Sequence, residues 1–167
     1  VLACTVKTGT NANPAIQTGL VKMLSANGNV AFNNIGGNVV IPTPDFATDV
    51  IIDTSNFVYT TGSSAGRIVS QKFNSVGKLL WQNTFDDAAT DNSSFETSGG
   101  ISIRRDGSGN LIVTGENRGN GIVMKLSGST GGAIWMKRFD ASLGRNCVIN
   151  GIGDVYVPCV SPSQVLK

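Results

Sequence analysis

Two segments of this chain, residues 57–86 and residues 111–140, repeat the same pattern. Both begin with three apolar or aromatic residues and a threonine, continue through a lysine followed by an apolar residue, and end on an apolar-tryptophan pair and Phe-Asp. The matching positions are 57–60 with 111–114, 72–73 with 125–126, 80–81 with 134–135, and 85–86 with 139–140. Units that recur about 50 residues apart are typical of repeat architectures, in which each unit packs on its neighbours. The repeat therefore constrains the fold more than any other feature.

Each copy is predicted to form four short antiparallel strands, A to D, joined by hairpin turns. In the first copy we expect strands at 48–53, 57–61, 67–73 and 78–85. In the second copy we expect them at 101–105, 111–115, 121–126 and 133–139. The connections at 106–110 (DGSGN) and 129–132 (STGG) are rich in Gly, Asn and Ser, and Gly and Asn supply the positive φ that tight turns need. The sequence therefore predicts an all-β fold.

Weaker copies of the unit flank these two. The matches are 146–157 with strands A and B, 164–167 with the start of strand C, 19–24 and 29–35 with strands C and D, and 1–6 with strand B. Phe32 stands near the tryptophan position, and Pro42 and Pro44 favour a linker or a sheet edge. The predicted units are a partial first unit with its linker at 1–46, a second with a long polar loop at 47–99, a third at 100–141, and a partial last unit at 142–167.

This pattern resembles the β-propeller repeat proteins of bacterial secreted and surface proteins (SBBP-type repeats). The likeness rests on the DGSGNLIVTG segment at 106–115, the apolar residues before Lys125, the glycine turn, and Trp135. The segment 128–135 (GSTGGAIW) is more loosely similar to quinoprotein-like blades. The resemblance implies antiparallel four-stranded blades of β-propeller type, about three units per chain with incomplete first and last units. It also implies an extracellular scaffold or interaction module without a catalytic site.

The predicted number of blades bears on how the chain assembles. A single-chain propeller closes with about four to eight blades, whereas about three are predicted here. Open strand edges in native proteins are normally paired or covered. We therefore expect the missing strands to come either from a longer polypeptide or from another copy of the chain. In the second case the N-terminal strands of one copy would complete the C-terminal part-blade of the next, in a head-to-tail ring or filament.

Composition and charge exclude several functions. The chain has 167 residues and a formal net charge of +2, which does not predict nucleic acid or an anionic membrane as a partner. It contains no histidine, so a Ser-His-Asp arrangement is impossible and the commonest general base and metal ligand are missing. No apolar run reaches about 18 residues, so no membrane span is predicted. We expect no catalytic residue, no hydrolase activity, no cofactor and no tightly bound transition metal.

Five aromatic residues occupy positions that repeat with the fold. They are Trp81, Trp135, Phe85, Phe139 and Phe32. We interpret them as structural residues that pack between adjacent units; the alternative for the tryptophans is a platform for a sugar. On the packing interpretation, replacing either tryptophan by alanine should cost about 3–5 kcal/mol. Lys72 and Lys125 also repeat, and we expect their stems to lie over a neighbouring sheet with the ammonium in water.

The three cysteines, Cys4, Cys147 and Cys159, match no metal-binding spacing. Two interpretations stay open for them: buried small apolar residues, or a disulfide. Cys4 and Cys159 fall in candidate B strands near the two ends of the chain. A covalent lock at a junction between copies would use one or both of them.

The acidic residues suggest turns or a calcium site. The calcium candidates are Asp86, Asp87 and Asp91 in the polar loop, for which a solvated loop is the alternative. Another set, Asp53, Asp106 and Asp154, lies at or near the A–B connections, where turn formation is a sufficient explanation. Asn92 begins an Asn-Ser-Ser sequon, a glycosylation site only if the protein is secreted from a cell that glycosylates.

The sequence therefore favours a non-enzymatic extracellular structural protein, a self-associating repeat subunit of a surface or filamentous assembly. The alternative is a lectin-like module that binds a carbohydrate or another surface protein through loops on one face. A further alternative is a fragment of a larger propeller protein, with a quinoprotein-like enzyme as the case that would carry a cofactor.

Overall fold

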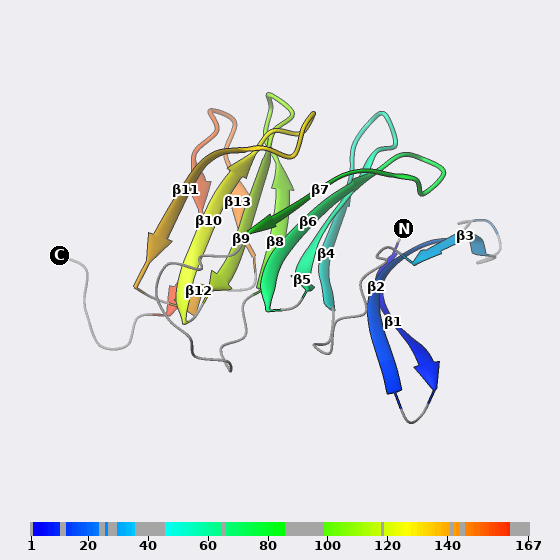
Figure 1. Ribbon diagram of the computed structural model, residues 1–167. Coiled ribbons are helices and arrows are strands. Elements are labelled where there is room, and N and C mark those ends of the chain that lie inside the picture. Colours follow the sequence, from blue (N-terminus) through cyan, green and yellow to red (C-terminus); the bar gives the residue numbers. More distant parts are fainter. Residues whose placement is uncertain are drawn as a thin grey trace.

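The computed structural model describes residues 2–10, 13–23, 26, 30–35, 46–64, 66–85, 99–117, 119–140, 142–143 and 146–160. Every regular element in these ranges is a β-strand and every strand pair is antiparallel, which confirms the predicted all-β class. The main sheets lie side by side in an open series (Figure 1). In the same ranges, no helix is long and apolar enough to cross a membrane.

The first sheet has three strands in the order β1-β2-β3. They are β1 (Leu2–Thr10), β2 (Asn13–Met23) and β3 (Val30–Ile35), at the places predicted for strands B, C and D of the first unit. β1 and β2 are longer than predicted and pair over the full length of β1. In the described part of the chain no A-type strand pairs with the other edge of β1, and β1 contacts β4 of the next sheet.

The second and third sheets each contain four strands in sequence order. The second comprises β4 (Phe46–Ile52), β5 (Val58–Ser64), β6 (Arg67–Phe73) and β7 (Leu79–Phe85). The third comprises β8 (Gly99–Arg105), β9 (Leu111–Asn117), β10 (Asn120–Leu126) and β11 (Ala133–Phe139). The predicted four-stranded units are thus confirmed, and β6 and β11 have the predicted bounds. Both sheets also carry a register shift at the same place in their first strand.

Strand pairing corrects the alignment of the two copies in strand B. Val58 pairs with Phe73 in the second sheet, and Leu111 pairs with Leu126 in the third. Val58 is therefore equivalent to Leu111, and the predicted match of Phe57 with Leu111 is wrong by one residue. Side chains alternate between the two faces of a strand, so this single step changes which residues face the neighbouring sheet.

The same turn closes four of the hairpins. Each begins with an Asp or Asn whose side chain accepts hydrogen bonds from the amides two and four residues later, at 2.8–3.1 Å. These first residues are Asp53, Asn74, Asp106 and Asn150. The fourth residue of each turn has a positive φ and is Asn56, Gly77, Gly109 or Gly153. Asp154, grouped in sequence with Asp53 and Asp106, is instead the last residue of its turn.

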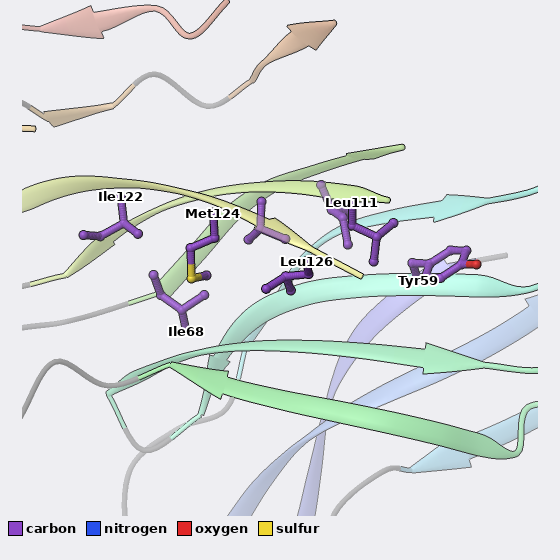
Figure 2. Close-up of a cluster of buried hydrophobic side chains, with 8 residues drawn as sticks. Tyr59, Ile68, Leu111, Ile122, Met124 and Leu126 are labelled. Atoms are coloured by element: carbon purple, nitrogen blue, oxygen red, sulfur yellow. The ribbon is translucent and has the colours of Figure 1, made fainter. Parts of the chain in front are cut away.

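The main core lies between the second and third sheets (Figure 2). Alternate residues of each strand point into it, because successive side chains of a strand face opposite sides. The buried members are Tyr59, Ile68, Ile103, Leu111, Val113, Ile122, Met124 and Leu126. Each fully buried aliphatic side chain contributes about 1.5–3 kcal/mol, so this interface is a large source of apolar stabilisation for the pair of sheets.

The last unit is shorter than the others in the part that the structure describes. β13 (Val148–Ile149) pairs with β14 (Val155–Tyr156), at the place predicted for strands A and B. β12 (Ser142–Leu143) pairs with β15 (Cys159–Val160), which the sequence did not predict. The β13–β14 hairpin packs on the outer face of the third sheet through a second apolar cluster. Its members are Ile112, Val123, Cys147, Ile149, Val155 and Val157. The predicted strand C at 164–167 lies outside the described residues.

Candidate interaction surface

Trp81 on β7 shows how one sheet holds the next. Its indole lies against the β10–β11 connection of the third sheet and packs on the main core. The indole Nε1 donates to the carbonyl oxygen of Gly128 at 3.4 Å. A Cβ placed on Gly131 would lie 2.6 Å from the Trp81 ring, so the ring occupies the space that a side chain there would need. Trp81 therefore fills the space between its own sheet and the β10–β11 connection of the next sheet.

Lys72 pairs with Trp81 across β6 and β7 and contacts the same connection. Its Nζ donates to the Gly128 oxygen at 2.9 Å and lies 4.3 Å from the centre of the Phe57 ring and 5.2 Å from that of Tyr59. Desolvation lowers the pKa of this amine, and the charge of Asp53 partly opposes the shift. The Lys72 ammonium, which is partly buried, is thus held by the carbonyl of the next sheet and by the faces of two rings of its own sheet.

Polar contacts between β4 and β8, the first strands of their sheets, also join the second sheet to the third. The Asp49 carboxylate on β4 accepts hydrogen bonds from the Ile103 amide at 3.0 Å and from the Arg104 guanidinium at 2.7 Å. The other arm of Arg104 donates to the side-chain oxygen of Asn146, just before β13. Arg104 thus bridges the second, third and last units, because the two arms of its guanidinium donate to different acceptors. The sequence analysis did not single out this residue.

A second inter-sheet contact involves Asp53, whose carboxylate accepts from the Tyr59 hydroxyl at 3.1 Å. The Arg105 guanidinium from β8 lies 4.0 Å from the same carboxylate. Burial, together with the hydrogen bond and charge of Asp53, raises the pKa of Tyr59, so its hydroxyl stays protonated as the donor.

Within the described residues, no neighbouring sheet packs on β11, the outer strand of the third sheet, as the third sheet packs on β7. Trp135 on β11 is equivalent to Trp81, because it pairs with Lys125 as Trp81 pairs with Lys72. Trp135 is nevertheless 37% exposed and Phe139 is 47% exposed, whereas Trp81 and Phe85 pack on the main core. Lys125 takes a different partner from Lys72, the Asp106 carboxylate of its own sheet at 2.8 Å. The same position of the repeat therefore has two environments.

The Lys125–Asp106 ion pair of the third sheet is largely buried, with side chains 26% and 6% exposed. Burial raises the Asp106 pKa, but the hydrogen bonds from Lys125 and from the amides of Asn110 and Ser108, together with the Lys125 charge, outweigh burial and lower the pKa overall.

The last hairpin presents a further exposed face. Val148 is 58% exposed and Tyr156 is 57% exposed. They pair across β13 and β14 as Ile51 and Tyr59 pair across β4 and β5, yet Tyr59 is only 2% exposed. An open hollow of about 610 Å³ lies along this hairpin, lined by Asn146, Cys147, Val148, Val155, Tyr156, Val157 and Pro158. Trp135 and Phe139 lie on the third sheet, whereas Val148 and Tyr156 lie on the hairpin that packs on this sheet. We call these four exposed residues together the terminal face.

The cysteines have distinct surroundings. Cys147 is buried and Cys159 is exposed, and both are free thiols, so they are not joined to each other. Burial raises the pKa of the Cys147 thiol, and the Ser102 hydroxyl 3.9 Å away opposes the shift. Cys147 thus packs as a small apolar residue. Cys4 lies on β1, opposite Gly19, and its side chain is outside the described part.

The remaining predicted sites fall into two groups. The calcium candidates Asp86, Asp87 and Asp91 and the sequon at Asn92 lie outside the described residues, and the side chain of Phe32 does too. Among the residues that are described, no three acidic, cysteine or histidine side chains gather as metal ligands. Asp53 and Asp106 instead accept backbone amide hydrogen bonds in their turns.

Comparison with known proteins adds information on the fold alone. No protein-family model matches the chain, and no curated protein matches it. The structure is similar to a crystal structure of a protein of unknown function from Bacteroides caccae, with a TM-score of 0.59 and 12% sequence identity. The match covers 100% of this chain and 57% of the other, so the chain spans just over half the length of that protein. The resemblance to SBBP-type repeats stays a prediction.

Proposed function

We propose that this protein is a non-enzymatic structural subunit whose β-propeller-type units associate head to tail in an extracellular or cell-surface assembly. One observation carries the proposal: the terminal face repeats the side chains of the internal interface, but leaves them exposed. In the interface between the second and third sheets, the equivalent residues Trp81, Phe85 and Tyr59 pack on the next sheet.

Exposed apolar surface of this kind is costly to leave in water. Large contiguous apolar patches on soluble proteins usually mark interaction sites. The internal interface shows which partner complements this one: a sheet that presents alternating Ile, Leu and Val on one face, as the third sheet presents Leu111, Val113 and Ile122 to the second. Another unit of the same repeat has this face, and a second copy of the chain supplies such units.

The non-enzymatic part of the proposal rests on chemistry. The chain has no histidine, and the charged side chains between the second and third sheets make structural contacts. Asp49 and Arg104 tie neighbouring strands, and Asp106 holds a turn and Lys125. A group whose hydrogen bonds are all made within the fold is not poised to act as a base or nucleophile.

The test is the mass of the purified chain by light scattering as its concentration is raised. We expect the mass to rise beyond that of a monomer, and Tyr156→Asp to lower the association because it places a charge in an apolar contact. The matched control is Val76→Asp, which adds the same charge at an exposed apolar residue in the β6–β7 turn. A chain that stays monomeric at high concentration would refute the assembly. That result is the one expected if another part of a longer polypeptide covers the terminal face.

A lectin-like module is the second candidate, and the exposure of Trp135 and Tyr156 favours it. Exposed aromatic rings stack on the apolar faces of sugars in the way that they pack on other apolar surfaces. A glycan array separates the two functions. Binding of a defined glycan by a monomeric chain, lost in Trp135→Ala, would favour the lectin over the assembly.

A further inference from the structure

We propose that Asn150 is a site of spontaneous deamidation, and that the carboxylate formed there weakens the β13–β14 hairpin. The reaction takes place within one chain, so it does not require the proposed self-association. The hairpin nevertheless carries Val148 and Tyr156, which belong to the terminal face.

The reaction uses only atoms of the chain and water. The backbone nitrogen of Gly151 attacks Cγ of Asn150, so that an N–Cγ bond forms and a succinimide ring closes. The Cγ–Nδ2 bond breaks, and ammonia leaves with the proton that the Gly151 nitrogen loses. Water then adds to either ring carbonyl and opens the ring, which leaves aspartate or isoaspartate at position 150. Glycine hinders this ring closure less than any other following residue, because it has no side chain.

The turn leaves the attacking nitrogen accessible. Gly151 is exposed, and a Cβ built on it would meet nothing within 4 Å. The hydrogen bonds that close the turn come from the amides of Asn150, Ile152, Gly153 and Asp154, and the Gly151 amide is not among these donors. The nitrogen can therefore react without the loss of a bond that holds the turn.

Two of these donors also assist the chemistry. The amides of Ile152 and Asp154 donate to Oδ1 of Asn150 at 3.1 and 2.8 Å. Negative charge develops on this oxygen when the Gly151 nitrogen attacks Cγ, and amide donors held in place stabilise such a charge in catalytic sites. The fold therefore supplies two donors at the atom that becomes negative.

The product does not fit the turn as asparagine does. Asn150 Nδ2 donates to the Asp154 carboxylate at 2.9 Å. In the two equivalent turns that begin with an aspartate, the fifth residue is Phe57 or Asn110, which carries no charge. A carboxylate at position 150 would face Asp154 and replace a hydrogen bond by repulsion between like charges. Deamidation therefore turns a compatible pair of residues into an incompatible one.

The chain contains its own comparison for this site. Asn-Gly pairs occur at 27–28, 120–121 and 150–151, and the first of them lies outside the described residues. Gly121 is a buried residue of β10 that pairs with Glu116 on one side and with Phe139 on the other. A backbone held between two strands must leave the sheet before it can close the ring. We therefore expect Asn150 to react in the folded chain and Asn120 to be protected.

Peptide mapping by mass spectrometry tests the site. The natural chain is incubated in water enriched in heavy oxygen and digested in ordinary water, so that ring opening labels only the deamidation of the incubation. We expect label at Asn150 in the folded chain, and label at Asn120 only in urea. Gly151→Ala should slow labelling of Asn150 several-fold, because its Cβ enters open space and hinders only the attack. A folded chain in which Asn150 is as protected as Asn120, or in which both are labelled equally fast, overturns the proposed site.

A second set of variants tests the effect on the hairpin. Asn150→Asp reproduces the aspartate product, and we expect the amides of β13 and β14 to exchange with solvent several-fold faster, because the contact with Asp154 becomes repulsive. Adding Asp154→Asn should restore slow exchange, since the pair then matches Asp106 and Asn110 of the third sheet. Unchanged exchange in Asn150→Asp, or faster exchange that the second substitution does not correct, overturns the effect on the hairpin. A particle mass that never rises overturns self-association and leaves the deamidation site standing.

Discussion

Replacing Trp81 and Trp135 separately by alanine tests whether the neighbouring sheet gives equivalent positions different energies. Both residues pair with a lysine in the same register of their sheets. Trp81 packs on the main core and on Gly131 of the next sheet, whereas Trp135 is 37% exposed. The sequence alone predicts equal costs; the structure predicts that Trp81→Ala is far more destabilising.

The magnitude follows from the surface that each ring buries. An aromatic side chain in a core buries about 150 Å² or more, which at about 25 cal/mol per Å² corresponds to ~4 kcal/mol. Trp81 is only partly enclosed and its indole hydrogen bond to Gly128 is long at 3.4 Å, so we expect Trp81→Ala to cost about 3 kcal/mol. Trp135 has no facing sheet on its outer side in the described residues, and its replacement should cost about 1 kcal/mol in the dilute chain.

Urea unfolding followed by circular dichroism measures both costs from the shift in midpoint at constant slope. The measurement must be made at a concentration where the chain is monomeric, because association would add to the apparent stability of the natural chain. Equal losses for the two variants, or a larger loss for Trp135→Ala, would refute the reasoning.

Two further predictions concern the turns. Gly131→Ala should cost about 1 kcal/mol for its positive φ and a further ~1–3 kcal/mol for overlap with the Trp81 ring, whereas Gly153→Ala, with a φ of +94° and open space, should cost only the first amount. Comparable urea midpoints for the two would contradict this. Because the Asp106 pKa is lowered by folding, the stability that its ionisation contributes is present above the ordinary aspartate pKa and is lost as the pH falls through the lowered value. Asp106→Asn keeps an acceptor for the turn but loses the charge facing Lys125, so stability measured from neutral to acid pH should fall less steeply than in the natural chain.

The parts of the fold that were predictable from the sequence are those set by local chemistry. Asp53 and Asp106 each start a turn whose fourth residue needs a positive φ, and Asn or Gly three residues later satisfies it. Runs of β-branched and aromatic residues between such turns predicted the strands, and β6 and β11 begin and end where they were placed. Hydrogen bonds within a few residues of each other decide these features.

The register of strand B was not predictable in the same way. Matching Phe57 to Leu111 aligns apolar residues well, but the structure makes Asn110 the equivalent of Phe57, each as the last residue of its turn. A polar and an aromatic residue share this position because the turn constrains the backbone there. The turn therefore gives a better alignment than apolar similarity does.

Contacts between distant residues were also beyond the sequence. Arg104 joins Asp49 and Asn146, which lie 55 and 42 residues away along the chain, and nothing in the spacing of charges indicates that contact. Arg104 is followed by a second arginine, and successive side chains of a strand face opposite sides. In sequence, the two charges therefore indicate solvent-exposed positions and no shared site. Only the packing of successive units against each other brings Asp49 and Asn146 within reach of Arg104.

The two lysines show what a repeat in sequence does and does not determine. Lys72 and Lys125 occupy the same register position beside a tryptophan, so both belong to the same face of their sheets. Their partners differ because the surroundings differ: Lys72 reaches the Gly128 carbonyl of the next sheet, while Lys125 turns back to Asp106. The sequence of a unit thus determines which face it presents, and the neighbour determines how that face is used. For the terminal face, the internal interface indicates the chemistry of a matching partner, an apolar face of another unit of the repeat. Self-association through this face is therefore testable with single substitutions such as Tyr156→Asp.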